Sequence, residues 1–151
     1  MTHAAILETT EAFGETTLTA DPARIVELCR YLKDNEKFVR LSAVTAVDRY
    51  PAEPRFEVIY HLHGFDPAVP NLASRRLRLK CRVSGNDPHI DSVTSVWRSA
   101  NWYEREVFDM FGVKFRNHPN HVRILMPVDW EGYPLRKDYP VHGYKYGYQN
   151  E

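Results

Sequence analysis

The feature that most limits how this chain can fold is an apolar segment near the C-terminus that has no regular periodicity. Residues 115–140 combine charges and prolines with many large apolar side chains: Phe115, Ile124, Leu125, Met126, Trp130, Tyr133, Leu135 and Tyr139. A helix would repeat such residues about every 3.6 positions, and a strand at every second position. A disordered tail would contain few aromatic residues. We therefore expect an irregular segment that packs against its own domain or against another protein.

The residues before this segment predict an α+β domain. Asp21 followed by Pro22 has the pattern of a helix N-cap, and apolar residues at helical spacing extend that helix to about Lys33. Four runs then favour strands: residues 39–48, 56–63, 76–83 and 90–96. No strand–helix–strand repeat is visible, which argues for an antiparallel sheet. Residues 1–20 give no element that we can place.

The third of these runs alternates sharply. On one side lie Leu77, Leu79, Cys81 and Val83, and on the other lie Arg76, Arg78, Lys80 and Arg82. A period of two with one charged face is typical of an antiparallel strand with one solvated side. The predicted fold is an α+β domain over residues 1–115, with an antiparallel sheet of three to four strands and helices packed on one face. An extended C-terminal arm over residues 116–151 follows this domain.

A second helix is predicted over residues 100–111. Its apolar residues gather on one face, and Gly112 stands at the position where glycine commonly ends a helix. Glu104 and Glu106 lie at opposite edges of the apolar stripe, so they cannot act together as a carboxylate pair. Trp102 lies on the polar face, where it either contacts another protein or packs under a loop of its own domain.

Composition argues against several classes of protein. Lys plus Arg and Asp plus Glu number 20 each, and a net charge of zero argues against a general nucleic-acid-binding protein. No apolar run approaches the roughly 18 residues of a membrane span, and the N-terminus has no signal-peptide pattern. Cys29 and Cys81 are expected to be free, buried thiols, and two cysteines are too few for a typical iron–sulfur cluster. We expect a cytosolic chain, or one attached to a membrane only through partners.

Two other functions compete for the same residues. The basic face of the strand at 75–83 would suit a nucleic-acid-binding module, although a solvated strand that resists edge-to-edge aggregation explains the same pattern. A stand-alone hydrolase-like enzyme would use Glu106 and His118 as its site. His118 and His121 have no matching Cys/His pair for a metal site, and no phosphate loop or nucleophile motif is present.

The last third of the chain resembles a known family. Residues 104–112 read EREVFDMFG, and Phe115, His118-Pro119 and Arg123-Ile124-Leu125 follow them. Residues 129–140 then read DWEGYPLRKDYP. Together these runs resemble the C subunit of NADH-quinone oxidoreductase, the thirty-kilodalton subunit family of respiratory complex I. The chain departs from the family pattern at residues 120–122, where a cation that is common in the family is missing.

The resemblance implies a structural subunit in the peripheral arm of a complex that passes electrons from NADH to quinone and couples this to proton translocation. Such a subunit holds no cofactor itself; FMN, iron–sulfur clusters and quinone belong to its partner subunits. The implied partners are the quinone-site subunit, of the D type, and cluster-bearing subunits of the B and I types. The arm would dock on a partner at the cytoplasmic side of the cell membrane, where the subunit is peripheral.

By the same resemblance, the residues of these runs contact partner subunits and are not catalysts. The predicted interface residues are Trp102, Glu104, Arg105, Glu106, Asp109, Gly112, His118, Pro119, Arg123, Asp129, Trp130, Gly132, Pro134, Leu135, Arg136, Lys137, Asp138 and Tyr139. No residue of this chain is expected to bind a cofactor or a metal.

Overall fold

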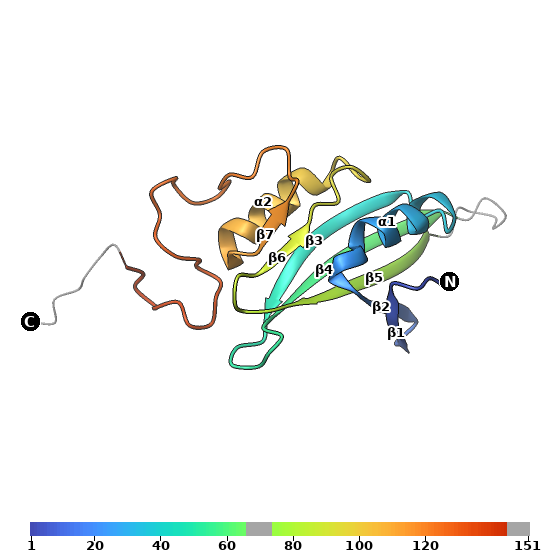
Figure 1. The fold of residues 1–151 in the computed structure, drawn as a ribbon, viewed down its shortest axis with the longest axis horizontal. Helices are drawn as coiled ribbons and strands as arrows, with labels where there is room; N and C mark the ends of the chain where they lie inside the picture. The colour runs from blue at the N-terminus through green and yellow to red at the C-terminus, as the bar shows by residue number, and fades with distance from the viewer. Residues whose placement is uncertain (66–73, 145–151) are drawn as a thin grey trace, which may run out of the picture.

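The computed structural model describes residues 1–65 and 74–144. Its elements are β1 (Ile6–Ala12), β2 (Glu15–Ala20), a 3-10 turn (Pro22–Arg24), α1 (Ile25–Asp34), β3 (Arg40–Asp48), β4 (Phe56–Phe65), β5 (Ser74–Val83), β6 (His89–Asp91), α2 (Ala100–Phe111) and β7 (Lys114–Arg116), as Figure 1 shows. Both predicted helices and the first three predicted strands are confirmed. The Asp21 carboxylate accepts a hydrogen bond from the N–H of Ala23 at 2.9 Å, as expected of a helix N-cap.

In the described part of the chain, the main sheet has five strands in the order β1-β2-β5-β4-β3. The β3–β4 and β4–β5 pairs are antiparallel, as the alternation in β5 predicts. However, β2 runs parallel to β5, with Leu18 opposite Leu79. The prediction of an antiparallel sheet of three to four strands was therefore wrong in strand number and in this pairing. A parallel pair needs a long connection, and α1, β3 and β4 supply it between β2 and β5.

The β1–β2 hairpin is a part of the main sheet that the sequence does not reveal. Phe13 and Gly14 at its tip both have positive φ, 54° and 74°, as in the tight turns that join antiparallel strands. Phenylalanine is uncommon in this conformation, so the turn has no recognisable signal. Six of the seven residues of β1 are exposed, which leaves no apolar alternation to detect.

A second, two-stranded parallel sheet joins β6 to β7. The predicted strand at 90–96 is shortened to β6, because the N–H groups of Val96 and Trp97 both turn back to the carbonyl of Val93. β7 has only three residues, which is too short for a periodic pattern. This small sheet places the chain that leaves α2 beside the chain that enters it.

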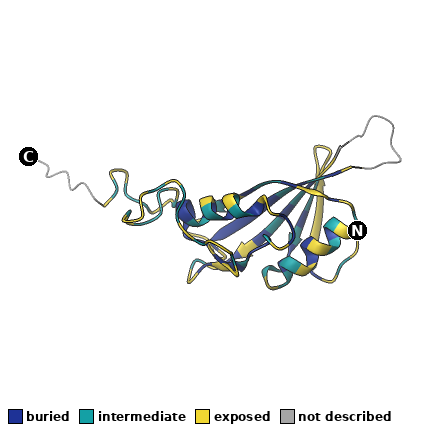
Figure 2. Cartoon of the chain, turned by 90° about the horizontal axis from the view of Figure 1, so that it is seen from above, coloured by how far each residue is buried: buried dark blue, intermediate teal, exposed yellow. Residues whose placement is uncertain are grey.

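One hydrophobic core lies between the main sheet and both helices. Its buried members include Leu77, Leu79, Cys81 and Val83 from β5, Ile25, Leu28, Cys29 and Leu32 from α1, and Ala100, Val107 and Met110 from α2. Cys29 and Cys81 are free and buried, as predicted. Because the residues of both helices join one cluster with the inward side of the sheet, the helices cover the same sheet face (Figure 2).

Residues 117–144 contain turns and bends but no helix or strand, and we call them the C-terminal segment. In Figure 1 this segment loops past α2 and leads away from the main sheet. Residues 145–151, which belong to the predicted arm, lie outside the described residues. The division into a domain and an arm that docks on a partner stays a prediction. None of the described helices has the length and apolar character needed to cross a membrane.

The position of Leu79 in the core gives a first testable prediction. This side chain is fully buried on β5 between β2 and β4. Leu79→Ala should lower the free energy of unfolding by about 3 kcal/mol, because it removes buried methyl groups and leaves a cavity. Urea denaturation measures this change. Thr45→Ala, at an exposed position of β3, should cost less than about 1 kcal/mol. Equal losses in the two variants would contradict this assignment of the core.

Candidate functional site

Helix α2 ends at Gly112, which adopts the left-handed conformation with φ of 76°. Its N–H donates to the carbonyl of Phe108 at 2.8 Å. A Cβ atom at this position would lie 2.5 Å from the Arg136 side chain and 2.6 Å from the ring of Tyr133. Glycine is therefore required twice, once for the backbone conformation and once for the close packing of the C-terminal segment.

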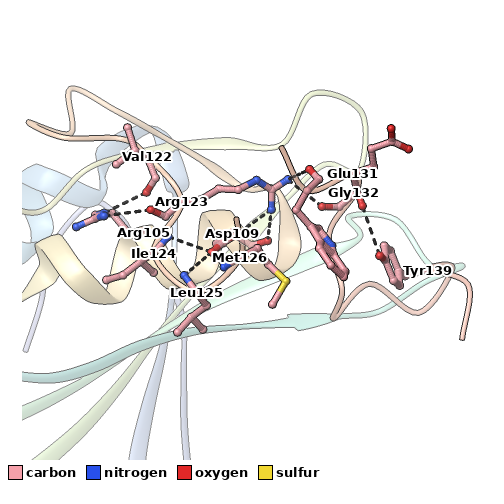
Figure 3. Close-up of polar contacts among 11 residues, drawn as sticks. Arg105, Asp109, Val122, Arg123, Ile124, Leu125, Met126, Glu131, Gly132 and Tyr139 are labelled. Carbon is pink, nitrogen blue, oxygen red and sulfur yellow. Dashed lines mark hydrogen bonds and ion pairs between the residues drawn. The ribbon is translucent and has the colours of Figure 1, made fainter. Parts of the chain in front are cut away.

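The buried carboxylate of Asp109 on α2 holds the first part of the C-terminal segment (Figure 3). Its Oδ2 atom accepts hydrogen bonds from the N–H groups of Ile124, Leu125 and Met126 at 3.0, 2.7 and 2.9 Å. Its Oδ1 atom accepts from the guanidinium of Arg123 at 2.6 Å. Three successive amides directed at one oxygen fix the backbone of this turn. We call these five residues the Asp109 cluster.

Two opposing effects act on the pKa of Asp109. Burial raises this pKa, whereas the hydrogen bonds from the backbone of the segment and from Arg123 lower it. The hydrogen bonds outweigh burial, and the pKa lies below the ordinary value for aspartate. The carboxylate is therefore ionised at neutral pH, and its charge is balanced within the Asp109 cluster.

Two arginines bind carbonyl groups of the C-terminal segment. Arg105 on α2 donates to the carbonyls of Val122 and Arg123 at 3.0 and 3.1 Å. Arg123 donates in turn to the carbonyls of Trp130 and Gly132 at 3.2 and 2.9 Å. In a segment without helix or strand, these bonds satisfy carbonyl groups that would otherwise need water. Side chains thus replace the backbone ladder of a regular element.

Glu104, also fully buried, faces the chain that enters α2. Its carboxylate accepts from the hydroxyl of Ser92 at 2.6 Å and from the N–H of Val93 at 2.7 Å. Burial raises the pKa of Glu104 to about 7, although these two hydrogen bonds act in the opposite direction. Glu104 therefore exchanges its proton in the neutral pH range while it holds the β6–α2 connection.

His118 lies beside Glu104 with its side chain buried. Its Nε2 atom is 3.8 Å from the Glu104 carboxylate and 3.0 Å from the carbonyl of Asn101. Because Nδ1 accepts from the N–H of Asn120 at 3.0 Å, the neutral ring carries its proton on Nε2 and donates to Asn101. Burial lowers the pKa of His118 and of the neighbouring His121. The geometry is that of hydrogen-bonded structural residues, which fix the chain after β7.

A second ionic cluster joins the C-terminal segment to the main sheet. Arg55 donates to the two carboxylate oxygens of Asp48 at 2.9 and 2.8 Å, and to those of Asp138 at 3.1 and 2.6 Å. Asp48 also accepts from the N–H of Lys137 at 2.8 Å. Burial raises the pKa of Asp48, but the hydrogen bonds from Arg55 and the backbone outweigh it and lower the pKa to about 2. We call these four residues the Arg55 cluster.

Residues 133–136 close the C-terminal end of α2. The Nε atom of Arg136 donates to the carbonyl of Phe111 at 2.6 Å, and its guanidinium lies 4.6 Å from the ring centroid of Tyr133. The N–H of Leu135 donates to the carbonyl of Met110 at 3.0 Å. The last carbonyls of a helix have no partner within it, so this segment supplies the C-terminal cap of α2.

Large apolar side chains remain exposed on this fixed backbone. More than half of those on the described part of the molecule belong to α2 or the C-terminal segment: Trp102, Val122, Leu125, Val128, Leu135, Val141 and Tyr144. The exposed fraction is 69% for Trp102, 58% for Leu125 and 93% for Val128. We call these seven residues the outer apolar surface. Because they belong to α2 and the C-terminal segment, these side chains are the candidate contact residues of the site.

The structure divides the predicted interface residues by burial. Fully or partly buried are Glu104, Arg105, Asp109, Gly112, His118, Arg123, Trp130, Gly132, Pro134, Arg136 and Tyr139. Exposed are Trp102, Glu106, Pro119, Asp129, Leu135, Lys137 and Asp138. Partner contact by any of them stays a prediction. Sequence reasoning missed Asp48 and Arg55, because more than 80 residues separate each from its contact in the C-terminal segment and no local pattern marks them.

The geometry does not favour either competing function. Glu106 is exposed, the side chain of His118 is buried, and no hydrogen bond or ion pair joins them within the described residues. On the basic face of β5, Arg78 pairs with Glu15 at 2.7 Å, and Lys80 pairs with Glu57 at 3.3 Å. Within residues 1–65 and 74–144, no group of three or more His, Cys, Asp and Glu side chains is placed to hold a metal ion.

Comparisons with known proteins agree with one another. The family model of the respiratory-chain NADH dehydrogenase 30 kDa subunit matches residues 18–145. The C subunit of the NADH-quinone oxidoreductase of Citrifermentans bemidjiense is 48% identical over 139 residues, which cover 92% of this chain and 83% of the relative. A trypsin-resistant fragment of Nqo5 is similar in structure, with 30% identity and a TM-score of 0.65 over 75% of this chain and 88% of the fragment. A chain of the membrane-bound sulfane sulfur reductase, an archaeal respiratory membrane complex, has 25% identity and a TM-score of 0.71 over 91% of this chain and 79% of its own length.

Asp109→Asn tests the role of the Asp109 cluster. The amide keeps the shape of the side chain, but it removes the negative charge and replaces one of the two acceptor oxygens by an NH2 group, which faces either Arg123 or the backbone amides. We expect the free energy of unfolding to fall by about 2 kcal/mol. Hydrogen–deuterium exchange should accelerate at the amides of Ile124, Leu125 and Met126. Glu106→Gln, an exposed carboxylate on the same helix, is the control, and equal exchange in both variants would refute the assignment.

The raised pKa of Glu104 predicts a pH-dependent stability. Its native pKa of about 7 lies above the ordinary 4.5, so the native state holds a proton that the unfolded state releases. This contribution is complete below about pH 4.5 and is lost as the pH rises to about 7, by at most about 3 kcal/mol. His118 and His121 act in the opposite direction, because their lowered pKa values favour the native state as the pH rises.

Glu104→Gln separates these effects. The free energy of unfolding of the wild type minus that of the variant should fall as the pH rises from about 4.5 to 7, measured by urea denaturation at each pH. Glu106→Gln, which neutralises an exposed carboxylate on the same helix, is the matched control. A difference between wild type and Glu104→Gln that is constant with pH would contradict a raised pKa.

Proposed function

The chain belongs to the family of the respiratory-chain NADH dehydrogenase 30 kDa subunit, and we propose that α2 and the C-terminal segment form the surface by which it binds neighbouring subunits. Membership makes it the thirty-kilodalton subunit of NADH-quinone oxidoreductase, in the peripheral arm of complex I. The proposal concerns what its residues do there. In it, the chain holds other subunits in position, and it takes no part in the chemistry.

In this proposal the redox groups belong to the partners. FMN and iron–sulfur clusters carry electrons from NADH to quinone, and the complex couples this transfer to proton translocation. The chain binds the quinone-site subunit, of the D type, and the cluster-bearing subunits of the B and I types. It lies on the cytoplasmic side of the cell membrane and reaches the membrane only through the complex. Because electron transfer depends on the distance between centres, a rigid non-redox subunit helps by keeping its neighbours in register.

The observation that carries the proposal is the combination of a fixed backbone with exposed apolar side chains. The Asp109 and Arg55 clusters hold residues 122–138 against the domain, while the outer apolar surface stays open. A segment that is ordered before binding loses less conformational entropy when it binds. Exposed tryptophan and leucine on such a backbone are therefore suited to the centre of an interface, where a few residues supply most of the binding energy.

This division assigns different roles to the predicted interface residues. The buried residues, such as Asp109 and Arg123, position the backbone and contact partners only through it. The exposed residues, such as Trp102 and Leu135, contact the partner directly. A substitution of the first kind should therefore alter the isolated chain, and a substitution of the second kind should alter only the assembly.

Capture of the complex tests the proposal. Tagged chain is expressed in a strain that lacks the native copy, and the complex is captured from membranes in mild detergent. Leu125→Asp combined with Val128→Asp should lower the co-purified NADH-quinone oxidoreductase activity by about tenfold, because both changes place charge in an apolar interface. Truncation after Pro127 should abolish recovery.

The control is Leu7→Asp combined with Phe13→Asp, which makes the same change at exposed positions of the β1–β2 hairpin. This pair should leave recovery unchanged. Thermal unfolding of each purified variant shows whether the chain itself is intact. Full recovery of active complex with the Leu125 and Val128 pair would reject the outer apolar surface as an interface.

A further inference from the structure

An open groove lies at the start of α2, away from the Asp109 and Arg55 clusters. It has a volume of about 820 Å³ and is formed by the end of α1, the start of β3 and the turn that enters α2. Its lining residues are Lys33, Val39, Arg40, Leu41, Tyr103 and residues 94–99. No member of the two ionic clusters or of the outer apolar surface lines it.

The charge of this groove has one sign. Lys33, Arg40 and Arg98 line it, and no aspartate or glutamate of the described residues does. The rest of the lining is neutral, with hydroxyl groups from the 94–99 turn and apolar groups at Val39 and Tyr103. In a chain whose net charge is zero, a groove with three cations and no acid is a local concentration of positive charge.

Within residues 1–65 and 74–144, two of these cations lack the acidic partner that six other arginines have. Arg24, Arg49, Arg55, Arg78, Arg116 and Arg123 each form an ion pair shorter than 3 Å. Arg40 and Arg98 are exposed, and neither forms an ion pair or side-chain hydrogen bond with any described residue. Lys33 donates to the carbonyl of Val96 at 2.6 Å, so this bond leaves its charge without an acidic partner. The groove therefore presents positive charge that the described part of the chain does not neutralise.

The floor and the rim of the groove suit an extended chain. β3 is an edge strand of the main sheet, but the Leu41 carbonyl at its start already accepts from the hydroxyl of Ser99 at 3.2 Å, so the groove offers a bound chain its side chains and not this carbonyl. Val39 is 48% exposed at the rim and offers an apolar contact beside the cations. A peptide with carboxylates and an apolar side chain matches both features, whereas a small anion would use only the charges.

We propose that this groove binds an acidic segment of a neighbouring subunit in the assembled complex. The carboxylates of that segment pair with Arg40, Arg98 and Lys33, and an apolar residue beside them contacts Val39. This surface is separate from the outer apolar surface, but its occupant rests on the proposed role of the chain as an assembly subunit. A charged rim contact adds specificity and speeds association more than it adds affinity.

Cross-linking in the intact complex identifies the occupant. A photoreactive benzoylphenylalanine at position 39 is irradiated in the detergent-purified complex, and the linked peptide is identified by mass spectrometry. We expect a link to a segment of another subunit that carries at least two carboxylates near the linked residue. A link only to lipid, to this chain itself or to a segment without acidic residues would overturn the proposal.

Charge reversal measures how much Arg40 and Arg98 contribute to assembly of the complex. Arg40→Glu combined with Arg98→Glu should lower recovery of the complex by about tenfold at about 0.15 M salt, because two attractive pairs become repulsive. The control is Arg76→Glu combined with Arg82→Glu, which changes the net charge equally on the open face of β5. Recovery equal to that of the control would overturn the proposal.

Two further measurements separate loss of binding from misfolding, and the groove from the outer apolar surface. Arg40→Gln combined with Arg98→Gln removes charge without repulsion, so it should show a smaller loss in the same direction if the reversed pair fails to fold. The Leu125 and Val128 variant tests the proposed function independently. If the Leu125 and Val128 variant assembles normally while the Arg40 and Arg98 variant does not, the outer apolar surface is rejected and the groove is kept. If only the Leu125 and Val128 variant fails to assemble, the groove alone is rejected.

Discussion

The ionised carboxylate of Asp109 is the group on which the organisation of the C-terminal segment depends. It lies at the junction of α2 with a turn that has no secondary structure, and it accepts three backbone amides and one guanidinium. Each bond involves a charged acceptor, which makes it stronger than a bond between neutral groups. Because all four donors come from consecutive residues, one side chain sets the direction of the chain after Val122. Later residues are held by further contacts, from Arg123 to the carbonyls of Trp130 and Gly132 and from Arg55 to Asp138.

The same principle holds along the rest of the segment, where arginines replace a backbone ladder. Arg105, Arg123 and Arg136 each donate to carbonyl groups, and Arg55 joins two carboxylates from distant parts of the chain. The planar guanidinium supplies several donors in a fixed geometry, which lysine cannot do. A loop held in this way keeps its outward side chains free. This explains how an apolar, irregular segment can be ordered and exposed at once.

Sequence periodicity predicted the parts of the fold that local alternation controls. The inward residues of β5, the apolar face of α2 and the glycine that ends it all follow from spacing along the chain. The β1–β2 hairpin was not predicted, because β1 is exposed and because phenylalanine rarely adopts the positive-φ conformation that Phe13 has in the turn. The resemblance marked Asp109 and Arg123 as important positions but gave no sign that they contact each other within the chain. The roles of Asp48 and Arg55 were not predicted for a different reason. Their partners are Lys137 and Asp138, and contacts between residues so far apart in the sequence leave no local pattern.

The distribution of paired charges around α2 connects the two surfaces. Arg123 and Arg55 find carboxylates within the chain, and both stabilise the segment that presents the outer apolar surface. Arg40 and Arg98 line the groove at the start of the helix and find none among the described residues. Arg105 and Arg136 also form no ion pair among the described residues, but both donate to carbonyl groups. The charges of Arg40 and Arg98 have no such bond within that part of the chain, so a second chain can supply their acids. Helix α2 therefore borders both a C-terminal segment with exposed apolar side chains and, at its start, a groove whose positive charge the described residues do not neutralise. This is the arrangement expected of a subunit that contacts more than one neighbour.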